Sequence, residues 1–168
     1  MQSNKSDISF DNIAKDIINT NKFNKLKEEK HHGLTRYIHV MRVSKFTYKI
    51  SKKLKMDYVS ATRAALLHDY FTKNDFGDKS SSGKELVNHP SVACINALKE
   101  FNLNELERNA IESHMFPLSK TLPKYKESWL LTIVDKSVAT YEMTKFKLSN
   151  ALTIYILFIM NMIMFGQK

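Results

Sequence analysis

Apolar residues recur every three or four positions along most of the chain, with polar residues between them. Between residues 36 and 54, for example, Ile38, Met41 and Phe46 fall at spacings that place them on one broad face of a helix. Apolar and polar residues rarely alternate over the length of a strand, and the chain has only 4 Gly and 3 Pro. The pattern predicts an all-α fold, a single compact helical bundle of about six to eight helices.

Helix ends can be placed from the residues that flank each apolar pattern. Asp7 or Ser9, Thr35 and Asn104 are suitable N-caps, and Gly33 is suited to end a helix with a positive φ. Residues 71–84 are rich in Ser, Gly and Asp, which predicts a loop at the rim of a pocket. The predicted helices cover about residues 9–30 with a break at 19–21, 36–54, 57–69, 88–101, 105–114, 128–146 and 150–165.

We divide the chain into an N-terminal helical segment (1–32), a core (33–146) and a C-terminal apolar helix (147–168). Residues 151–165 are apolar on nearly every side. A helix of that length reaches about 22 Å, less than the roughly 30 Å hydrocarbon core of a membrane. We therefore expect no membrane span, and place this helix on the core or in the interface of a homodimer, with association at a membrane surface as a further alternative.

Positive charge is concentrated at the front of the chain. Residues 1–55 hold 13 of the 26 Lys and Arg but only 5 of the 17 Asp and Glu. Such a field attracts anionic ligands, and suits either a phosphorylated small molecule or nucleic acid. The lone Cys94 and the lack of a secretory leader predict a cytoplasmic protein.

The chemistry of the chain centres on His68 and Asp69, which end a strongly apolar run. An imidazole and a carboxylate are costly to bury without partners, and a divalent cation is a good partner for both. Similar groups occur in or beside other apolar segments, and 20 to 29 residues separate successive members, enough for one helix and loop each. These further candidates are His39, His89, His114 and Asp135.

The series His39, His68-Asp69 and Asp135 resembles the HD domain of metal-dependent phosphohydrolases, over roughly residues 33–142. The resemblance implies that these four residues hold a divalent ion and that His68 and Asp69 are catalytic. In branches with two metals, residues matching His89 and His114 complete the second site, and Asp69 bridges the two ions. Mixed His and carboxylate ligands suit Fe, Mn, Mg, Co, Ni or Zn.

The resemblance also implies a reaction. We expect hydrolysis of a phosphate ester or anhydride, of a nucleotide-like substrate, by a metal-activated hydroxide. Arg36, Arg42 and Lys73 are candidate contacts for the substrate anion. The Gly-Tyr-Pro signature of the cyclic-di-GMP phosphodiesterase branch is absent, which argues against that substrate.

Two other functions stay open on the sequence. The first is a non-catalytic sensor that binds metal and nucleotide in an HD-like pocket. The second is a basic helical protein that binds nucleic acid, in which the His and Asp residues belong to the core. The match of several separated residues in order favours the hydrolase.

Overall fold

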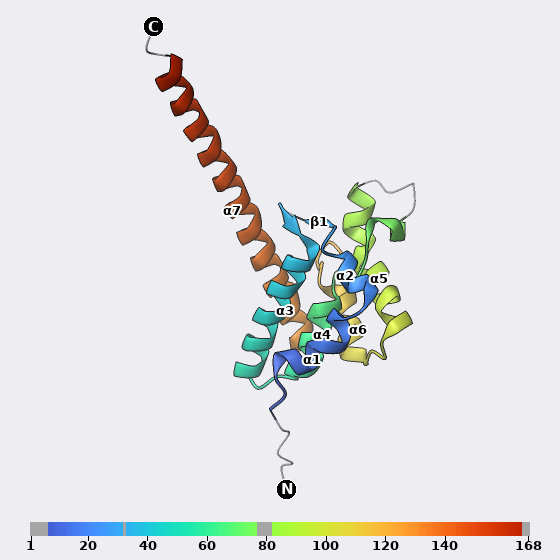
Figure 1. Cartoon of the computed structure of the whole chain (residues 1–168). Coiled ribbons are helices and arrows are strands. Elements are labelled where there is room, and N and C mark those ends of the chain that lie inside the picture. Colours follow the sequence, from blue (N-terminus) through green and yellow to red (C-terminus); the bar gives the residue numbers. More distant parts are fainter. Residues whose placement is uncertain (1–6, 32, 77–81, 166–168) are drawn as a thin grey trace.

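A computed structural model describes residues 7–31, 33–76 and 82–165, and over these residues it is a bundle of α-helices with one small hairpin (Figure 1). The all-α prediction is confirmed. In chain order the elements are α1 (Phe10–Ile18), α2 (Asn21–Lys25), β1 (Lys30–His31), β2 (Leu34–Thr35), α3 (Arg36–Lys53), α4 (Tyr58–Leu67), the 3-10 helix η1 (Lys73–Phe76), α5 (Ser82–Glu100), α6 (Glu105–Ser113) and α7 (Lys126–Phe165).

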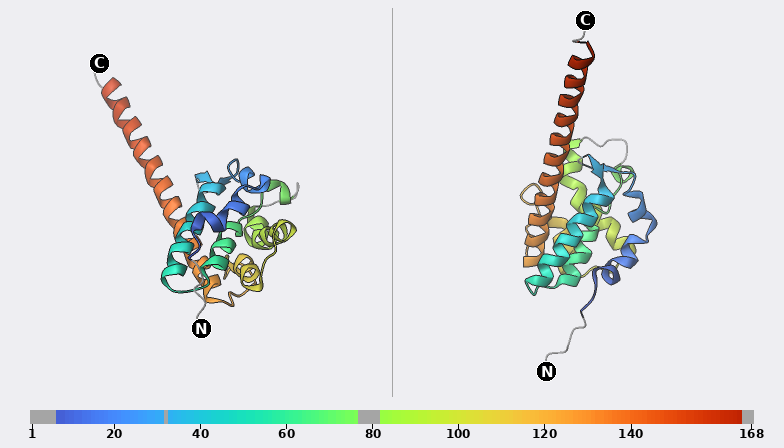
Figure 2. Two further views of the ribbon diagram at one scale, coloured as in Figure 1. Left: turned by 60° about the horizontal axis from the view of Figure 1, so that its bottom comes forward. Right: turned by 60° about the vertical axis from the view of Figure 1, so that its left-hand side comes forward.

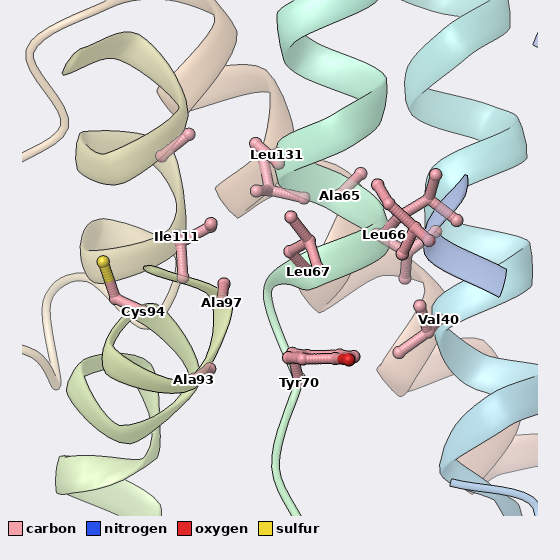
Figure 3. Close-up of a cluster of buried hydrophobic side chains, with 14 of the residues drawn as sticks. Val40, Ala65, Leu66, Leu67, Tyr70, Ala93, Cys94, Ala97, Ile111 and Leu131 are labelled. Carbon is pink, nitrogen blue, oxygen red and sulfur yellow. The ribbon is translucent and has the colours of Figure 1, made fainter. Parts of the chain in front are cut away.

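Helix α4 lies at the centre of the bundle. It packs against α3 on one side and against α5 and α6 on the other, and α7 crosses α3, α4 and α6. Figure 3 shows the side chains of α4 between Val40 of α3 and Ile111 of α6, which are both fully buried. The small residues Ala61, Ala64 and Ala65 of α4 are also fully buried, so the neighbouring helices approach its backbone closely. This close packing lets five helices contribute side chains to one buried region.

Most helix starts follow the predicted caps. The side chain of Thr35 accepts a hydrogen bond from the backbone N–H of Ile38, and Ser9 caps α1 in the same way. Asn104 and Glu107 form a reciprocal capping box at the start of α6. These short-range hydrogen bonds depend on neighbouring residues, which explains why the sequence predicted them well.

Two local predictions were wrong. Helix α5 begins at Ser82 rather than near residue 88, so Pro90 lies inside the helix and not in its first turn. The helix continues through Pro90, whose missing N–H removes one backbone donor from α5. Gly33 has the expected positive φ, 85°, but it belongs to the turn between β1 and β2. Within the predicted loop 71–84, residues 73–76 form η1, and residues 77–81 lie outside the described residues.

Helix α7 is one continuous helix of 40 residues, where the sequence suggested two. Its second half extends away from the bundle (Figures 1 and 2). Residues 148–157 are exposed, and among them Leu148, Leu152 and Tyr155 are large and apolar. Residues 148–157 therefore do not pack on the core, and the dimer interface and the membrane surface both stay predictions. Within the described residues, no helix combines the length and the apolar character needed to cross a membrane.

Candidate metal centre

Six side chains from five helices or their ends meet in the centre of the bundle, and all six are buried. They are His39 of α3, His68 and Asp69 directly after α4, His89 of α5, His114 directly after α6, and Asp135 of α7. The structure thus brings together all six residues that the sequence proposed as metal ligands. Their action as ligands stays a prediction.

One group consists of His39, His68 and Asp135. The Oδ1 atom of Asp135 lies 3.0 Å from Nε2 of His39 and 3.5 Å from Nε2 of His68. Two imidazoles from different helices therefore face a single carboxylate oxygen. Each residue of this group offers a ligand atom within 4.8 Å of the others, close enough to share one ion.

A second group consists of His89, His114 and Asp69. The Nε2 atoms of the two histidines lie 3.0 Å apart. The Oδ1 atom of Asp69 lies 3.4 Å from Nε2 of His89 and 3.8 Å from Nε2 of His114. This arrangement again gathers two imidazole nitrogens around one carboxylate oxygen.

Asp69 lies between the two groups. Its Oδ1 atom faces His89 and His114, whereas its Oδ2 atom lies 3.9 Å from Nε2 of His68. A carboxylate with one oxygen toward each group has the geometry of a bridging ligand. The helix end that carries His68 and Asp69 consequently contributes to both groups.

The hydrogen bonds of His68 and His114 determine which ring nitrogen is available. Nδ1 of His68 donates to the backbone oxygen of Ala65 at 2.7 Å, and Nδ1 of His114 donates to that of Ile111 at 2.7 Å. A carbonyl oxygen can only accept, so each neutral ring carries its proton on Nδ1 and a lone pair on Nε2. Both histidines end their helices in the same way, and both direct Nε2 toward the carboxylates.

His39 is held between two carboxylates. Its Nε2 faces Asp135, and its Nδ1 lies 2.9 Å from Oε2 of Glu142. Burial disfavours the charged ring, but the hydrogen bonds to Asp135 and Glu142 outweigh it and raise the pKa of His39 to about 10. In the metal-free protein this ring is therefore an imidazolium that donates to both carboxylates.

The pKa values of His114, His68 and Asp135 shift in directions that depend on the charged groups around each. Burial and the nearby rings of His68 and His89 lower the pKa of His114 to about 3, so this ring is neutral. Burial opposes charge on His68 as well, yet Asp69 and Asp135 raise its pKa. Burial also opposes ionisation of Asp135, but the hydrogen bond with His39 and the positive charge that His68 can carry nearby hold its pKa well below the usual range.

These residues fit a divalent cation. Such ions bind imidazole nitrogen and carboxylate oxygen at about 2.0–2.2 Å, which places ligands of one ion roughly 3–4 Å apart. The distances within both groups, from 3.0 to 3.9 Å, lie in this range. In addition, the buried Nε2 of His68 has no hydrogen-bond partner in the described part of the chain. A lone pair without a donor, facing carboxylate oxygens, is what a bound cation would satisfy.

Comparison with known proteins agrees with this geometry. The family model described as HD domain matches residues 36–140, which include all six residues of the two groups. The chain belongs to the HD domain family. Membership implies a divalent metal ion, and leaves its identity open.

Curated relatives of this HD domain protein include ribonucleases. Ribonuclease Y of Malacoplasma penetrans is 32% identical over 106 residues, which are 61% of this chain and 20% of that protein. Ribonuclease Y of Ureaplasma parvum serovar 3 is 29% identical over 111 residues, 66% of this chain and 21% of that protein. The chain thus spans about a fifth of the length of these relatives. No solved structure is significantly similar to it.

The three residues predicted to contact the substrate anion differ in their burial and in their partners. Arg36 is buried beside Asp69, with Nε 3.8 Å from Oδ2, and it donates to the backbone oxygen of Phe71 at 2.8 Å. Arg42 donates to Oε1 of Glu142 at 2.8 Å, on the far side of His39. Lys73 is exposed. Arg36 and Arg42 therefore contact carboxylates of the protein, and binding of substrate by all three stays a prediction.

Two residues outside the predicted set also belong to the site. Glu142 follows Asp135 by two helical turns, so both lie on one face of α7, and Glu142 is buried. Lys136 donates from Nζ to the backbone oxygen of His114 at 3.0 Å. For Glu142 the available signal was its place seven residues after Asp135. For Lys136 it was only its position next to Asp135.

Proposed function

We propose that this HD domain is a metal-dependent phosphohydrolase that cleaves a phosphate ester or anhydride of a nucleotide-like substrate. The observation that carries the proposal is the position of Asp69, with one carboxylate oxygen toward each of two groups of buried imidazoles. A site of this kind gathers buried nitrogen and oxygen ligands that suit divalent cations. A purely structural core would instead satisfy the buried Nε2 atom of His68.

The proposed ligands are His39, His68, Asp69 and Asp135 for one ion and His89, His114 and Asp69 for a second. A bound divalent cation lowers the pKa of water and stabilises negative charge on phosphoryl oxygens. The backbone hydrogen bonds of His68 and His114 place the proton of each neutral ring on Nδ1, which leaves Nε2 as the atom that a metal would bind. It also orients His39 through Glu142, a carboxylate that accepts from the ring nitrogen opposite the site.

In the proposed reaction, Asp69 accepts a proton from the attacking water, and His68 helps to position that water. The oxygen of the water forms the new bond to phosphorus, and the bond from phosphorus to the leaving oxygen breaks. The leaving oxygen then takes up the proton. The products are an alcohol, or a second phosphate when an anhydride is cleaved, together with the released phosphate group.

The relatives support a nucleotide-like substrate. Both are ribonucleases by name, so phosphate esters of nucleotides are the natural class to test on this chain. The excess of Lys and Arg in residues 1–55 also favours an anionic substrate. A sensor that binds metal and nucleotide without turnover remains the alternative.

The test uses the full chain after removal of metal and reconstitution with Mn²⁺. We expect hydrolysis of p-nitrophenyl phosphate, bis(p-nitrophenyl) phosphate or nucleotides that depends on the metal and stops with a chelator. The Asp69→Asn variant should fold and lose at least about 100-fold in kcat/KM. Metal and nucleotide binding with no turnover of any of these compounds would support the sensor and contradict the hydrolase.

A further inference from the structure

A cavity of about 330 Å³ opens beside the proposed metal centre. Its inner end is formed by Asp69, Asp135, His89 and His114, so a molecule in the cavity would reach the metal centre directly. Its volume is at the lower end of the range for small-molecule pockets, about 300–1,000 Å³. The size suits a small ligand better than a segment of a polymer.

Lys136 is the one cationic side chain among the described residues that line this cavity. It is half-buried, and its Nζ donates to the backbone oxygen of His114 at 3.0 Å. That bond holds the ammonium group next to the histidine that ends α6. An ammonium group has three donors, and among the described residues only this one hydrogen bond of Nζ is formed. The remaining donors are available to a ligand.

Part of the lining of this cavity is apolar. Met115 and Leu118 lie in the segment after α6, and Met143 lies on α7. Leu118 and Met143 are 53% and 39% exposed, so their apolar surfaces are open to a ligand. Methionine adapts its shape to flat apolar groups, and such a wall suits an aromatic ring or a nucleobase. The cavity therefore combines an anion-binding end with an apolar wall.

We propose that Lys136 binds a phosphoryl oxygen of the substrate and that the substrate is a small phosphomonoester whose organic group lies against Met115, Leu118 and Met143. This inference rests on the proposed function. A monoester carries up to two negative charges, whereas a diester carries one, so an added cation beside the metal centre favours the monoester. A terminal phosphate also needs room for only one organic group.

The test compares Lys136→Met with Lys147→Met, an exposed lysine on the same helix. A hydrogen bond to a charged group is worth about 10- to 100-fold. We therefore expect Lys136→Met to lower kcat/KM for p-nitrophenyl phosphate by about that factor, mainly through KM. The loss for bis(p-nitrophenyl) phosphate should be less than about fivefold, since the diester carries one charge fewer. Lys136→Arg should recover part of the loss, and Lys147→Met should behave as the wild type.

Two further measurements separate this inference from the proposed function. Binding of inorganic phosphate to the Mn²⁺-loaded chain is measured by calorimetry, and metal content is measured by elemental analysis. Weaker phosphate binding in Lys136→Met with unchanged metal content supports the inference, even if the wild type hydrolyses none of the esters. Unchanged phosphate binding, equal losses for both esters, or a fall in metal content would each overturn it. A fall in metal content would show that Lys136 acts through His114.

Discussion

The Oε2 atom of Glu142 lies 2.9 Å from Nδ1 of His39, on the side of the ring opposite Asp135. Glu142 is buried, and its second oxygen accepts from Arg42 at 2.8 Å. The carboxylate thus fixes the orientation of the ring, and in the proposed metal-bound state it would keep the proton of His39 on Nδ1. Arg42 in turn compensates the charge of Glu142, although its own side chain is partly exposed.

Replacement of this carboxylate should weaken metal binding without removal of a ligand. We expect Glu142→Ala to lower metal affinity by about 10- to 100-fold, the usual cost of losing a carboxylate behind a ligating histidine. Arg42→Met should have a smaller effect, because Glu142 would still accept from His39. Calorimetric titration of the metal-free chain with Mn²⁺ measures both affinities, and circular dichroism checks the fold. A Glu142→Ala protein with wild-type affinity would contradict the role assigned here.

Metal content should distinguish the two groups of ligands. His114 is a proposed ligand of the second ion and not of the first, so His114→Ala is expected to reduce the bound metal from about two ions per chain to about one. Asp69 faces both groups, and Asp69→Asn should lower the affinity at both sites. Elemental analysis after dialysis at a defined free metal concentration gives the ratio. If His114→Ala keeps the full metal content of the wild type, His114 is not a ligand.

The metal-free chain should lose stability as the pH rises above neutrality. The pKa of His39 is raised from 6.5 to about 10, so the folded state binds this proton more tightly than the unfolded state does. The stabilisation is complete below about pH 6.5 and is lost as the pH rises through 10. Because one proton is involved, the free energy of unfolding should fall by at most about 1.4 kcal/mol per pH unit over this range.

Denaturant unfolding in the presence of a chelator, between pH 6 and 10, measures this dependence. His39→Gln keeps a polar side chain that does not titrate, and it should show a shallower loss over the same range. Bound metal reverses the sign, because it competes with the proton for Nε2 and binds more tightly at high pH. Equal slopes for the wild type and His39→Gln would rule out His39 as the source.

The six central residues could be found from the sequence because each is a chemically costly group within an apolar segment. His68 and Asp69 end a run of apolar residues, and Asp135 follows another, so their burial could be anticipated. These residues occur in the same order as in the HD family, and that resemblance predicted that His39, His68, Asp69 and Asp135 come together. Most helices could likewise be predicted from the spacing of apolar residues and from the capping residues.

The partners of charged residues could not be found in the same way. Glu142 and Arg42 are 100 positions apart, and they meet only because α7 crosses α3. In the sequence alone, Glu142 resembles the family's sequence after its final Asp, but nothing there identifies His39 or Arg42 as its partners. Information on such distant partners lies in the tertiary packing. The start of α5 was missed for a different, local reason, because Ser82 and Gly83, with which the helix begins, are residue types typical of a loop.

The exposed part of α7 leads to a prediction about assembly. Leu148, Leu152 and Tyr155 are 57% to 69% exposed and recur at spacings of four and three residues, the pattern of a helix that pairs with another helix. Monomeric proteins rarely expose apolar surface of this extent without a partner. We therefore expect the chain to form a dimer through this segment.

Sedimentation of the full chain over a range of concentrations measures the association. Leu152→Glu places a charge in the centre of the apolar stripe and should shift the protein to the monomer, with at least a tenfold weaker dimer. Ser149→Glu is the matched control, because Ser149 is an exposed polar residue on the same helix, and it should leave the dimer intact. A wild-type chain that stays monomeric at high concentration, or a dimer that persists in Leu152→Glu, would contradict this prediction. Association of the wild type with lipid vesicles instead would identify a membrane surface as the partner of this helix.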